Sequence, residues 1–140
     1  MIRRAVSSDY QFLSKYYKEF DENGVNIFES GPFSNVFVYE KDRNIVGFIC
    51  YSIIYERAEI EYIYVDETYR RQNIAQELMD LCIEDVVQRG CENITLEVND
   101  KNVKGLSLYE KYGFAQVAKR PNYYRGTDGV LMMKELKKDE

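Results

Sequence analysis

An arginine-rich turn lies between a predicted apolar strand at residues 60–65 and a predicted helix. It reads Tyr69-Arg70-Arg71-Gln72-Asn73-Ile74-Ala75-Gln76. The first N–H groups of a helix have no intrahelical partner and the helix dipole is positive at that end, so such a turn attracts anions. The two arginines add charge, and the segment is typical of a pyrophosphate-binding loop. The alternative is that Arg70 and Arg71 are solvated loop charges.

A carboxylate and a phenol follow at positions that suit acid–base chemistry. Glu97 lies near the carboxyl end of a predicted strand at residues 93–98, and Tyr109 lies about two turns into a helix that Asn102 begins. In open α/β sheets, ligands bind beyond the carboxyl ends of strands, which is also where the arginine-rich turn leaves its strand. We therefore expect these groups to gather at one site. The alternatives are a solvent-facing Glu97 and a core Tyr109.

The composition excludes several kinds of protein. The 140 residues contain no low-complexity linker or long charge block, so we expect one domain over residues 1–140. The net charge of −5 argues against a nucleic-acid partner. No apolar run approaches the roughly 20 residues that span a bilayer, and no signal-peptide core follows Met1, so we expect a cytoplasmic protein that is not in a membrane.

The chain has no histidine, which excludes every mechanism that needs an imidazole. The three cysteines Cys50, Cys82 and Cys91 show no CxxC spacing, so we expect no metal site. Any acid–base work must fall to Glu, Asp, Tyr, Lys or Cys.

Hydrophobic periodicity predicts an α/β (α+β) domain with a mixed sheet covered by helices. Predicted strands lie at residues 2–6, 36–40, 45–55, 59–65, 93–98, 114–120 and 129–136, and residues 41–44 form a hairpin turn. One helix, capped by Ser7 or Ser8, runs to about residue 20. A second spans residues 73–89 and buries positions 74, 78, 81, 82 and 86, and Gly90 ends it. A third runs from Asn102 to residues 112–113.

Together these motifs resemble the GNAT N-acetyltransferases, which use acetyl-CoA, and within them the ribosomal-protein-alanine N-acetyltransferase group. The resemblance covers nearly the whole chain. It is most specific at residues 58–65, 69–75, 96–99, 102–114 and 120–124. It implies a GNAT-like, mostly antiparallel sheet of six to seven strands flanked by about four helices.

The resemblance also implies roles for individual residues. Glu97 would be the proton acceptor and Tyr109 the proton donor to the departing thiolate, and Tyr123-Tyr124 would line the peptide entrance. The implied cofactor-binding residues are Ile63, Tyr64 and Val65 for the pantetheine arm, Arg70, Arg71, Gln72, Asn73, Ile74, Ala75 and Gln76 for the pyrophosphate, and Asn102.

The chain departs from the family pattern at Asn73, where the family expects the first glycine of the phosphate loop. Asparagine is one of the few residues other than glycine that enter left-handed backbone space readily. We therefore expect the turn to survive and CoA binding to be weakened but retained.

The acceptor can be argued from amine chemistry. An α-amine with a pKa near ~8 is about one tenth free base at pH 7, whereas a lysine near ~10.4 costs roughly 3 kcal/mol more to deprotonate. A single carboxylate is therefore matched better to a protein N-terminus, and the N-terminal alanine of a ribosomal protein is one candidate. A tyrosine of ordinary pKa would protonate a thiolate fully at a cost of about 2 kcal/mol, so Tyr109 should donate while the C–S bond breaks.

Three other functions stay open at this point. In the first, the enzyme transfers acetyl to a polyamine, an aminoglycoside or a lysine. In the second, which Asn73 motivates, the chain is a catalytically silent acyl-CoA sensor. A nucleotide-binding βαβ domain is disfavoured because neither phosphate-binding glycine motif occurs. A monomer and a homodimer are both open.

Overall fold

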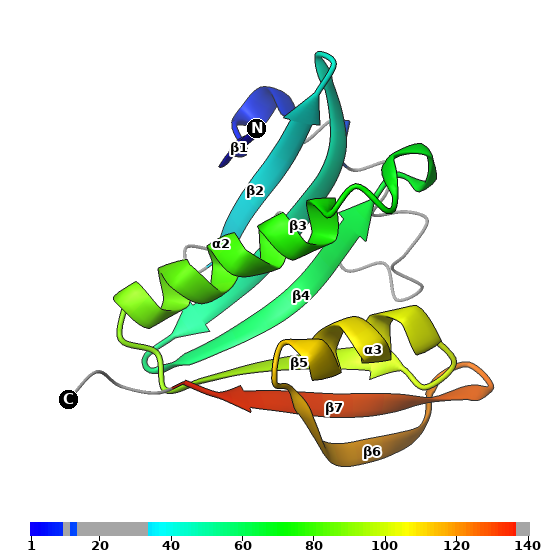
Figure 1. Ribbon diagram of the computed structural model, residues 1–140. Helices are drawn as coiled ribbons and strands as arrows, with labels where there is room; N and C mark the ends of the chain where they lie inside the picture. The colour runs from blue at the N-terminus through cyan, green and yellow to red at the C-terminus, as the bar shows by residue number, and fades with distance from the viewer. Residues whose placement is uncertain (10–11, 14–33, 137–140) are drawn as a thin grey trace. The chain divides into compact units, whose positions relative to one another are not determined.

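The computed structural model describes residues 1–9, 12–13 and 34–136 (Figure 1). The described helices are α2 (Ile74–Gln88), α3 (Val103–Lys111) and the 3-10 helix η2 (Glu67–Tyr69), and residues 7–9 and 12–13 are also helical. The strands are β1 (Ile2–Arg4), β2 (Ser34–Lys41), β3 (Asn44–Ile54), β4 (Arg57–Val65), β5 (Asn93–Asn99), β6 (Ala115–Tyr124) and β7 (Thr127–Glu135).

The strands are hydrogen-bonded in the order β1-β2-β3-β4-β5-β7-β6. β4 and β5 are parallel, and α2 connects them, because parallel strands need a long crossover. The pairs β1–β2, β2–β3, β5–β7 and β6–β7 are antiparallel. The predicted α/β (α+β) fold with a mixed, mostly antiparallel sheet is confirmed.

The chain forms two compact units, Met1–Ser52 with Glu61–Glu84 and Ile53–Ile60 with Asp85–Glu140. β3, β4 and α2 each give residues to both units. The end of β4 and the arginine-rich turn belong to the first unit, and β5, α3, β6 and β7 belong to the second. The single domain over residues 1–140 stays a prediction.

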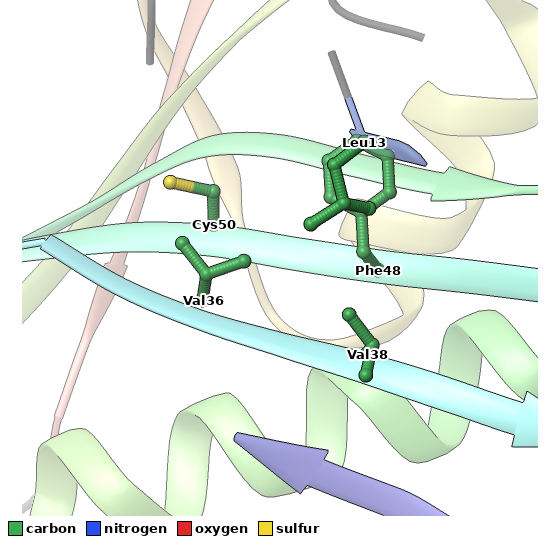
Figure 2. Close-up of a cluster of buried hydrophobic side chains, with 5 residues drawn as sticks. All are labelled: Leu13, Val36, Val38, Phe48 and Cys50. Atoms are coloured by element: carbon green, nitrogen blue, oxygen red, sulfur yellow. The ribbon is translucent and has the colours of Figure 1, made fainter. Parts of the chain in front are cut away.

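In the first unit, β3 has two buried faces because successive side chains of a strand point to opposite sides. Figure 2 shows the cluster on one of them, in which Leu13 lies against Val36 and Val38 of β2 and Phe48 and Cys50 of β3. Val36 is directly opposite Cys50 across the strand pair, and Val38 is opposite Phe48. This register brings the four strand side chains onto one face.

The other face of β3 packs against α2 at Gly47. A Cβ atom at Gly47 would lie 2.8 Å from the Tyr64 carbonyl oxygen and 3.4 Å from Cγ2 of Ile74. The glycine therefore allows strand and helix to approach closely. α2 buries Ile74, Leu78, Met79, Cys82 and Val86, whereas the predicted face had Leu81, which is half-buried, instead of Met79.

The N-terminal strand is shorter than the predicted residues 2–6. The Asp9 carboxylate accepts a hydrogen bond of 2.8 Å from the Val6 N–H. It also forms an ion pair with Arg3 at 2.8 Å. The Arg3 hydrogen bond holds the pKa of Asp9 below its ordinary value. The strand thus ends at Arg4, and residues 7–9 are already helical. Residues 10–11 and 14–20 of the predicted helix lie outside the described residues.

In the second unit, β5 alternates in the way its sequence predicts. Ile94, Leu96 and Val98 are buried on one face, where Leu96 is opposite Met132 and Val98 is opposite Val130 of β7. By the two-residue period of a strand, Glu97 points to the other face. β5, β7 and β6 run side by side in Figure 1.

The β6–β7 hairpin extends past the predicted strand ends at Arg120 and at residue 129. Its register shifts between Arg120 and Tyr124, where Asn122 has a φ of 55° and its N–H donates to Asp128 Oδ1 at 3.0 Å. Pro121 cannot donate a ladder hydrogen bond, which explains both the predicted end and the irregularity. Pairing then resumes, with Tyr124 opposite Thr127.

We expect Gly47→Ala to destabilise the protein by about 1–3 kcal/mol, because the new methyl group would overlap the Tyr64 carbonyl. Urea unfolding followed by circular dichroism measures the change. Ser52→Ala in the same strand is the matched control and should change stability by less than about 0.5 kcal/mol. Equal stability of Gly47→Ala and the unmodified chain would contradict the packing described.

Candidate functional site

The arginine-rich turn leaves β4 through a short capped helix. Asp66 follows the last strand residue, and its Oδ1 accepts a hydrogen bond of 2.9 Å from the Thr68 N–H, which caps η2. Arg70 then returns to extended backbone with φ −67° and ψ 158°. The first helical hydrogen bond of α2 runs from Glu77 N–H to the Asn73 carbonyl at 3.0 Å.

Two residues of the turn adopt left-handed backbone. Arg71 has a φ of 68° and Asn73 a φ of 63°. The predicted left-handed conformation of Asn73 is therefore confirmed. Ile74 begins α2 directly after it and is buried, which anchors the start of the helix.

The two arginines differ in their contacts. Arg70 Nε donates a hydrogen bond of 3.2 Å to the carbonyl oxygen of Val65, so this side chain folds back onto the end of β4. The Arg71 side chain is exposed. Of the two, Arg71 is therefore the cation whose charge is presented to solvent without a bond to the end of β4.

The end of β2 also contacts the turn and the first turn of α2. Lys41 Nζ donates to Gln72 Oε1, and Tyr39 forms a hydrogen bond with Glu77 that raises the pKa of the phenol. Sequence reasoning missed both contacts because they join segments far apart in the chain. Glu77 suits the helix dipole, whereas its charge opposes an anion at the same end.

The three residues proposed for the pantetheine arm form the end of β4. Ile63, Tyr64 and Val65 are half-buried, and the ring of Tyr64 lies 6.0 Å from that of Phe48. The structure places them directly before the Arg70 turn within the first unit. Their main-chain contacts with a cofactor stay a prediction.

Glu97 belongs to the second unit and is not solvent-facing. Its side chain is 13% exposed, and Arg120 Nε lies 2.7 Å from Oε1. Both carboxylate oxygens are shielded from solvent. The short distance establishes an ion pair with Arg120, and a hydrogen bond with Glu97 is among the causes that raise the pKa of Tyr123, so the Tyr123 hydroxyl also faces the carboxylate.

Tyr109 is a buried residue of α3. It is 8% exposed, its ring lies edge-on to Phe114 at 6.0 Å, and burial raises its pKa to about 12. Asn102 caps the helix as predicted, because its Oδ1 accepts a hydrogen bond of 3.0 Å from Gly105 N–H. The side-chain oxygen of Asn102 is thus used in capping the helix. The contact of Asn102 with the cofactor stays a prediction.

Two neighbouring phenols, Tyr123 and Tyr124, lie near the two predicted catalytic residues. Tyr123 and Tyr124 pack edge to face at 4.9 Å. Burial raises the pKa of Tyr124 to about 12, and Glu97, Tyr123 and Tyr109 all add to the shift. Tyr124 is therefore within electrostatic reach of both predicted catalytic residues, so the second unit brings the carboxylate and the phenol to one cluster.

Arg120 is the site residue that sequence reasoning missed. Arg120 belongs to the segment 120–124 that resembles the family, but its pairing with Glu97 depends on the register of three strands. One sequence signal was present, because Pro121 inside a strand pattern indicates an irregular hairpin that can redirect the side chains beside it.

The cysteines offer little reactivity. Cys50, Cys82 and Cys91 are free and buried, and burial raises the pKa of Cys50 and of Cys91. Over residues 1–9, 12–13 and 34–136, no group of three His, Cys, Asp or Glu residues is placed to hold a metal ion. Within the same ranges, no helix is long and apolar enough to cross a membrane.

Known proteins resemble the chain in sequence. It is 38% identical over 82 residues to N-alpha-acetyltransferase 30 of Dictyostelium discoideum, which covers 58% of the chain and 44% of that relative. It is 31% identical over 93 residues to the [ribosomal protein bS18]-alanine N-acetyltransferase of Escherichia coli K12, which covers 66% of the chain and 63% of that relative. The matched segments thus span less than two thirds of either relative.

The fold also matches a solved structure and a family model. Ard1 from Thermoplasma volcanium superposes with a TM-score of 0.86 at 26% identity, over 99% of this chain and 98% of that one. A model of the acetyltransferase (GNAT) family matches residues 2–114. Since this model spans most of the sequence, the chain belongs to the GNAT acetyltransferase family.

Proposed function

We propose that the protein is an acetyl-CoA-dependent N-acetyltransferase that moves acetyl to a primary amine, most favourably the N-terminal α-amine of a protein. The observation that carries the proposal is the cluster of the second unit, in which a shielded carboxylate and a buried phenol flank one tyrosine. The relatives named above support the class of acceptor, since one is named for an N-alpha-amine and the other for the alanine of a ribosomal protein.

The residues of the first unit fit the phosphates of CoA. The left-handed positions at Arg71 and Asn73 give the turn before α2 the backbone shape in which successive N–H groups form an anion-binding concavity. Arg71 is exposed and able to add a charge-assisted hydrogen bond. We assign residues 70–76 to the pyrophosphate, the main chain of residues 63–65 to the pantetheine arm, and Asn102 as a further contact.

Acetyl-CoA supplies the thioester whose acetyl group is transferred by direct attack of the amine with both substrates bound. Glu97 takes a proton from the acceptor amine group, directly or through one water, so that the nitrogen lone pair is free to attack the thioester carbonyl. Tyr109 gives its proton to the sulfur as the C–S bond breaks. With a Tyr109 pKa of about 12 and a thiol pKa near ~8.5, complete transfer costs about 5 kcal/mol, more than the 2 kcal/mol or so for an ordinary tyrosine. Tyr109 therefore hydrogen-bonds the sulfur first and donates its proton only while the C–S bond breaks.

A small amine or a lysine remains the second candidate acceptor, and the silent acyl-CoA sensor the third. One experiment separates all three. Incubation with acetyl-CoA and matched panels of N-terminal peptides, lysine peptides and polyamines, with thiol release as the readout, should give the highest kcat/KM for free N-termini. CoA binding without thiol release on any panel would favour the sensor. A cytoplasmic location stays a prediction.

We expect calorimetry to show micromolar or tighter binding of CoA, and Arg71→Ala to weaken it about tenfold because a charge-assisted contact is worth about 1.5–3 kcal/mol. Binding should also weaken as salt rises. Arg57→Ala, an exposed arginine at the opposite end of β4, is the matched control and should bind as the unmodified chain does. No binding at millimolar CoA would sink the assignment of the turn.

A second prediction concerns the backbone of Asn73. Asn73→Gly should keep or tighten CoA binding, because glycine accepts a φ of 63° without strain and removes a side chain from the phosphate approach. Asn73→Ala should lose affinity or stability, since alanine disfavours this region by about 1–2 kcal/mol. Weaker CoA binding by a folded Asn73→Gly would instead show that the amide side chain itself contacts the cofactor.

The catalytic roles predict a split between binding and turnover. Glu97→Gln should lower kcat by ~10²-fold or more while CoA affinity is nearly unchanged, and Tyr109→Phe should lower kcat to a smaller extent. Glu59→Gln is the matched control for Glu97, because Glu59 lies on the neighbouring strand and is exposed. Unmodified rates in folded Glu97→Gln would reject its role as base.

Burial of Tyr109 predicts an unusual alkaline profile. Its raised pKa of about 12 keeps the hydroxyl protonated at pH ~10, where an ordinary tyrosine would be half ionised. We therefore expect kcat to hold from pH ~8 to ~10.5, and Tyr109→Phe to lower that plateau without shifting it. An alkaline loss of kcat with a midpoint near pH ~10 that disappears in Tyr109→Phe would contradict the buried donor.

A further inference from the structure

The β6–β7 hairpin aims one cation at the proposed base. Arg120 is opposite Gly129, and Glu97 is opposite Leu131, so the Arg120 side chain crosses β7 to reach β5. Two strand spacings amount to roughly 9–10 Å, which a long side chain spans only when it lies flat on the sheet. The observed 2.7 Å from Arg120 Nε to Glu97 Oε1 shows that it does so.

Gly129 provides the space on this face. A Cβ atom there would lie 3.0 Å from the Cβ of Tyr123 and 3.1 Å from its ring. The Tyr123 side chain therefore rests on the bare backbone of β7. Arg120 Cζ in turn lies 5.3 Å from the centre of the Tyr123 ring, within the range of a cation–π contact.

The irregular backbone between β6 and β7 delivers both residues. The shift of register between Arg120 and Tyr124 is held by the hydrogen bond from Asn122 N–H to Asp128 Oδ1, at 3.0 Å. A non-glycine residue in left-handed backbone, as Asn122 is, is uncommon and is worth a functional question. Here its effect is to bring Tyr123 back over Gly129.

Glu97 needs fixed partners because both of its carboxylate oxygens are shielded from solvent. Among the described residues, Arg120 is its ion-pair partner, and the Tyr123 hydroxyl is its hydrogen-bond partner. A shielded carboxylate with free rotation would not keep its lone pairs directed at an incoming amine, and catalysis is sensitive to such displacements.

We propose that Arg120 is a positioning residue whose guanidinium, held between the Tyr123 ring and Glu97, fixes the Glu97 carboxylate in the orientation in which it accepts the proton of the acceptor amine. The proposal rests on the proposed function of Glu97 as base. In this role Arg120 acts through Glu97, to which its guanidinium is paired. Its planar guanidinium performs two tasks at once, since one edge faces the carboxylate and one face covers the ring.

The kinetic test compares two neighbouring cations of β6. Arg120→Met keeps the length of the side chain and removes its charge, while Lys119→Met removes a half-exposed cation whose partner is Asp128 at 3.6 Å. We expect Arg120→Met to lower kcat about tenfold or more with the KM for acetyl-CoA unchanged, because part of the general-base contribution is lost. Lys119→Met should keep the unmodified kcat, and Arg120→Lys should restore part of it.

A second readout does not depend on activity. Burial raises the pKa of Tyr123 most. Glu97 raises it further through its charge and a hydrogen bond, Arg120 lowers it, and Glu59 adds to the rise. Titration of labelled tyrosine followed by NMR should therefore give a lower Tyr123 pKa in Glu97→Gln, a higher one in Arg120→Met and no change in Lys119→Met. This signature reports the contact even in a protein that acetylates nothing.

The outcomes separate the inference from the function on which it rests. An unmodified protein that releases no thiol with any amine refutes the proposed function, while the Tyr123 titration still decides whether Arg120 faces Glu97. An active protein in which folded Arg120→Met keeps the unmodified kcat overturns the positioning role. Unchanged Tyr123 titration in both Glu97→Gln and Arg120→Met overturns the contact itself.

Discussion

A carboxylate shielded from water must be compensated by a positive or hydrogen-bonding partner, and in the second unit this requirement organises the hairpin around Glu97. Among the described residues, the compensating charge for Glu97 comes from Arg120, which lies two strands away, and the Tyr123 hydroxyl adds a hydrogen bond. Arg120 meets the need only because β7 has a glycine under Tyr123 and because the strand register shifts beside Arg120. An irregular hairpin and a buried acid are thus parts of one arrangement.

The first unit depends on a different constraint, which is backbone shape. Arg71 and Asn73 both occupy left-handed space. The burial of Ile74 at the start of α2 and the packing of Tyr64 of β4 against Phe48 secure the elements on either side of the turn. Anion binding by main-chain N–H groups depends on φ and ψ more than on side-chain identity. This explains how the chain departs from the family's glycine and still forms the turn.

Burial alters the chemistry that the same residues would have in water. A tyrosine with a pKa of about 12 is a poorer acid than a free phenol, yet it stays protonated over the whole range in which an amine becomes free base. The neighbouring Tyr124 is shifted in the same direction by the same environment, with Glu97, Tyr123 and Tyr109 adding to its burial. The cluster therefore keeps its phenols neutral beside one carboxylate. This arrangement suits a carboxylate that takes a proton and a phenol that holds a proton to donate.

The sequence by itself determined the elements and the kinds of group at the site. Alternating apolar residues placed Glu97 on its strand, Asn102 marked the start of the helix of Tyr109, and the absence of histidine limited the chemistry to carboxylates, phenols, amines and thiols, because these features depend on local periodicity, capping and composition. Tertiary structure decided the rest. The Glu97–Arg120 pair, the contact of Lys41 with Gln72 and the raised pKa of Tyr109 depend on strand register, on close approach of distant segments and on burial. Pro121 signals an irregular hairpin but not which residue Arg120 meets, since each of these features is set by which parts of the chain pack together rather than by neighbouring residues.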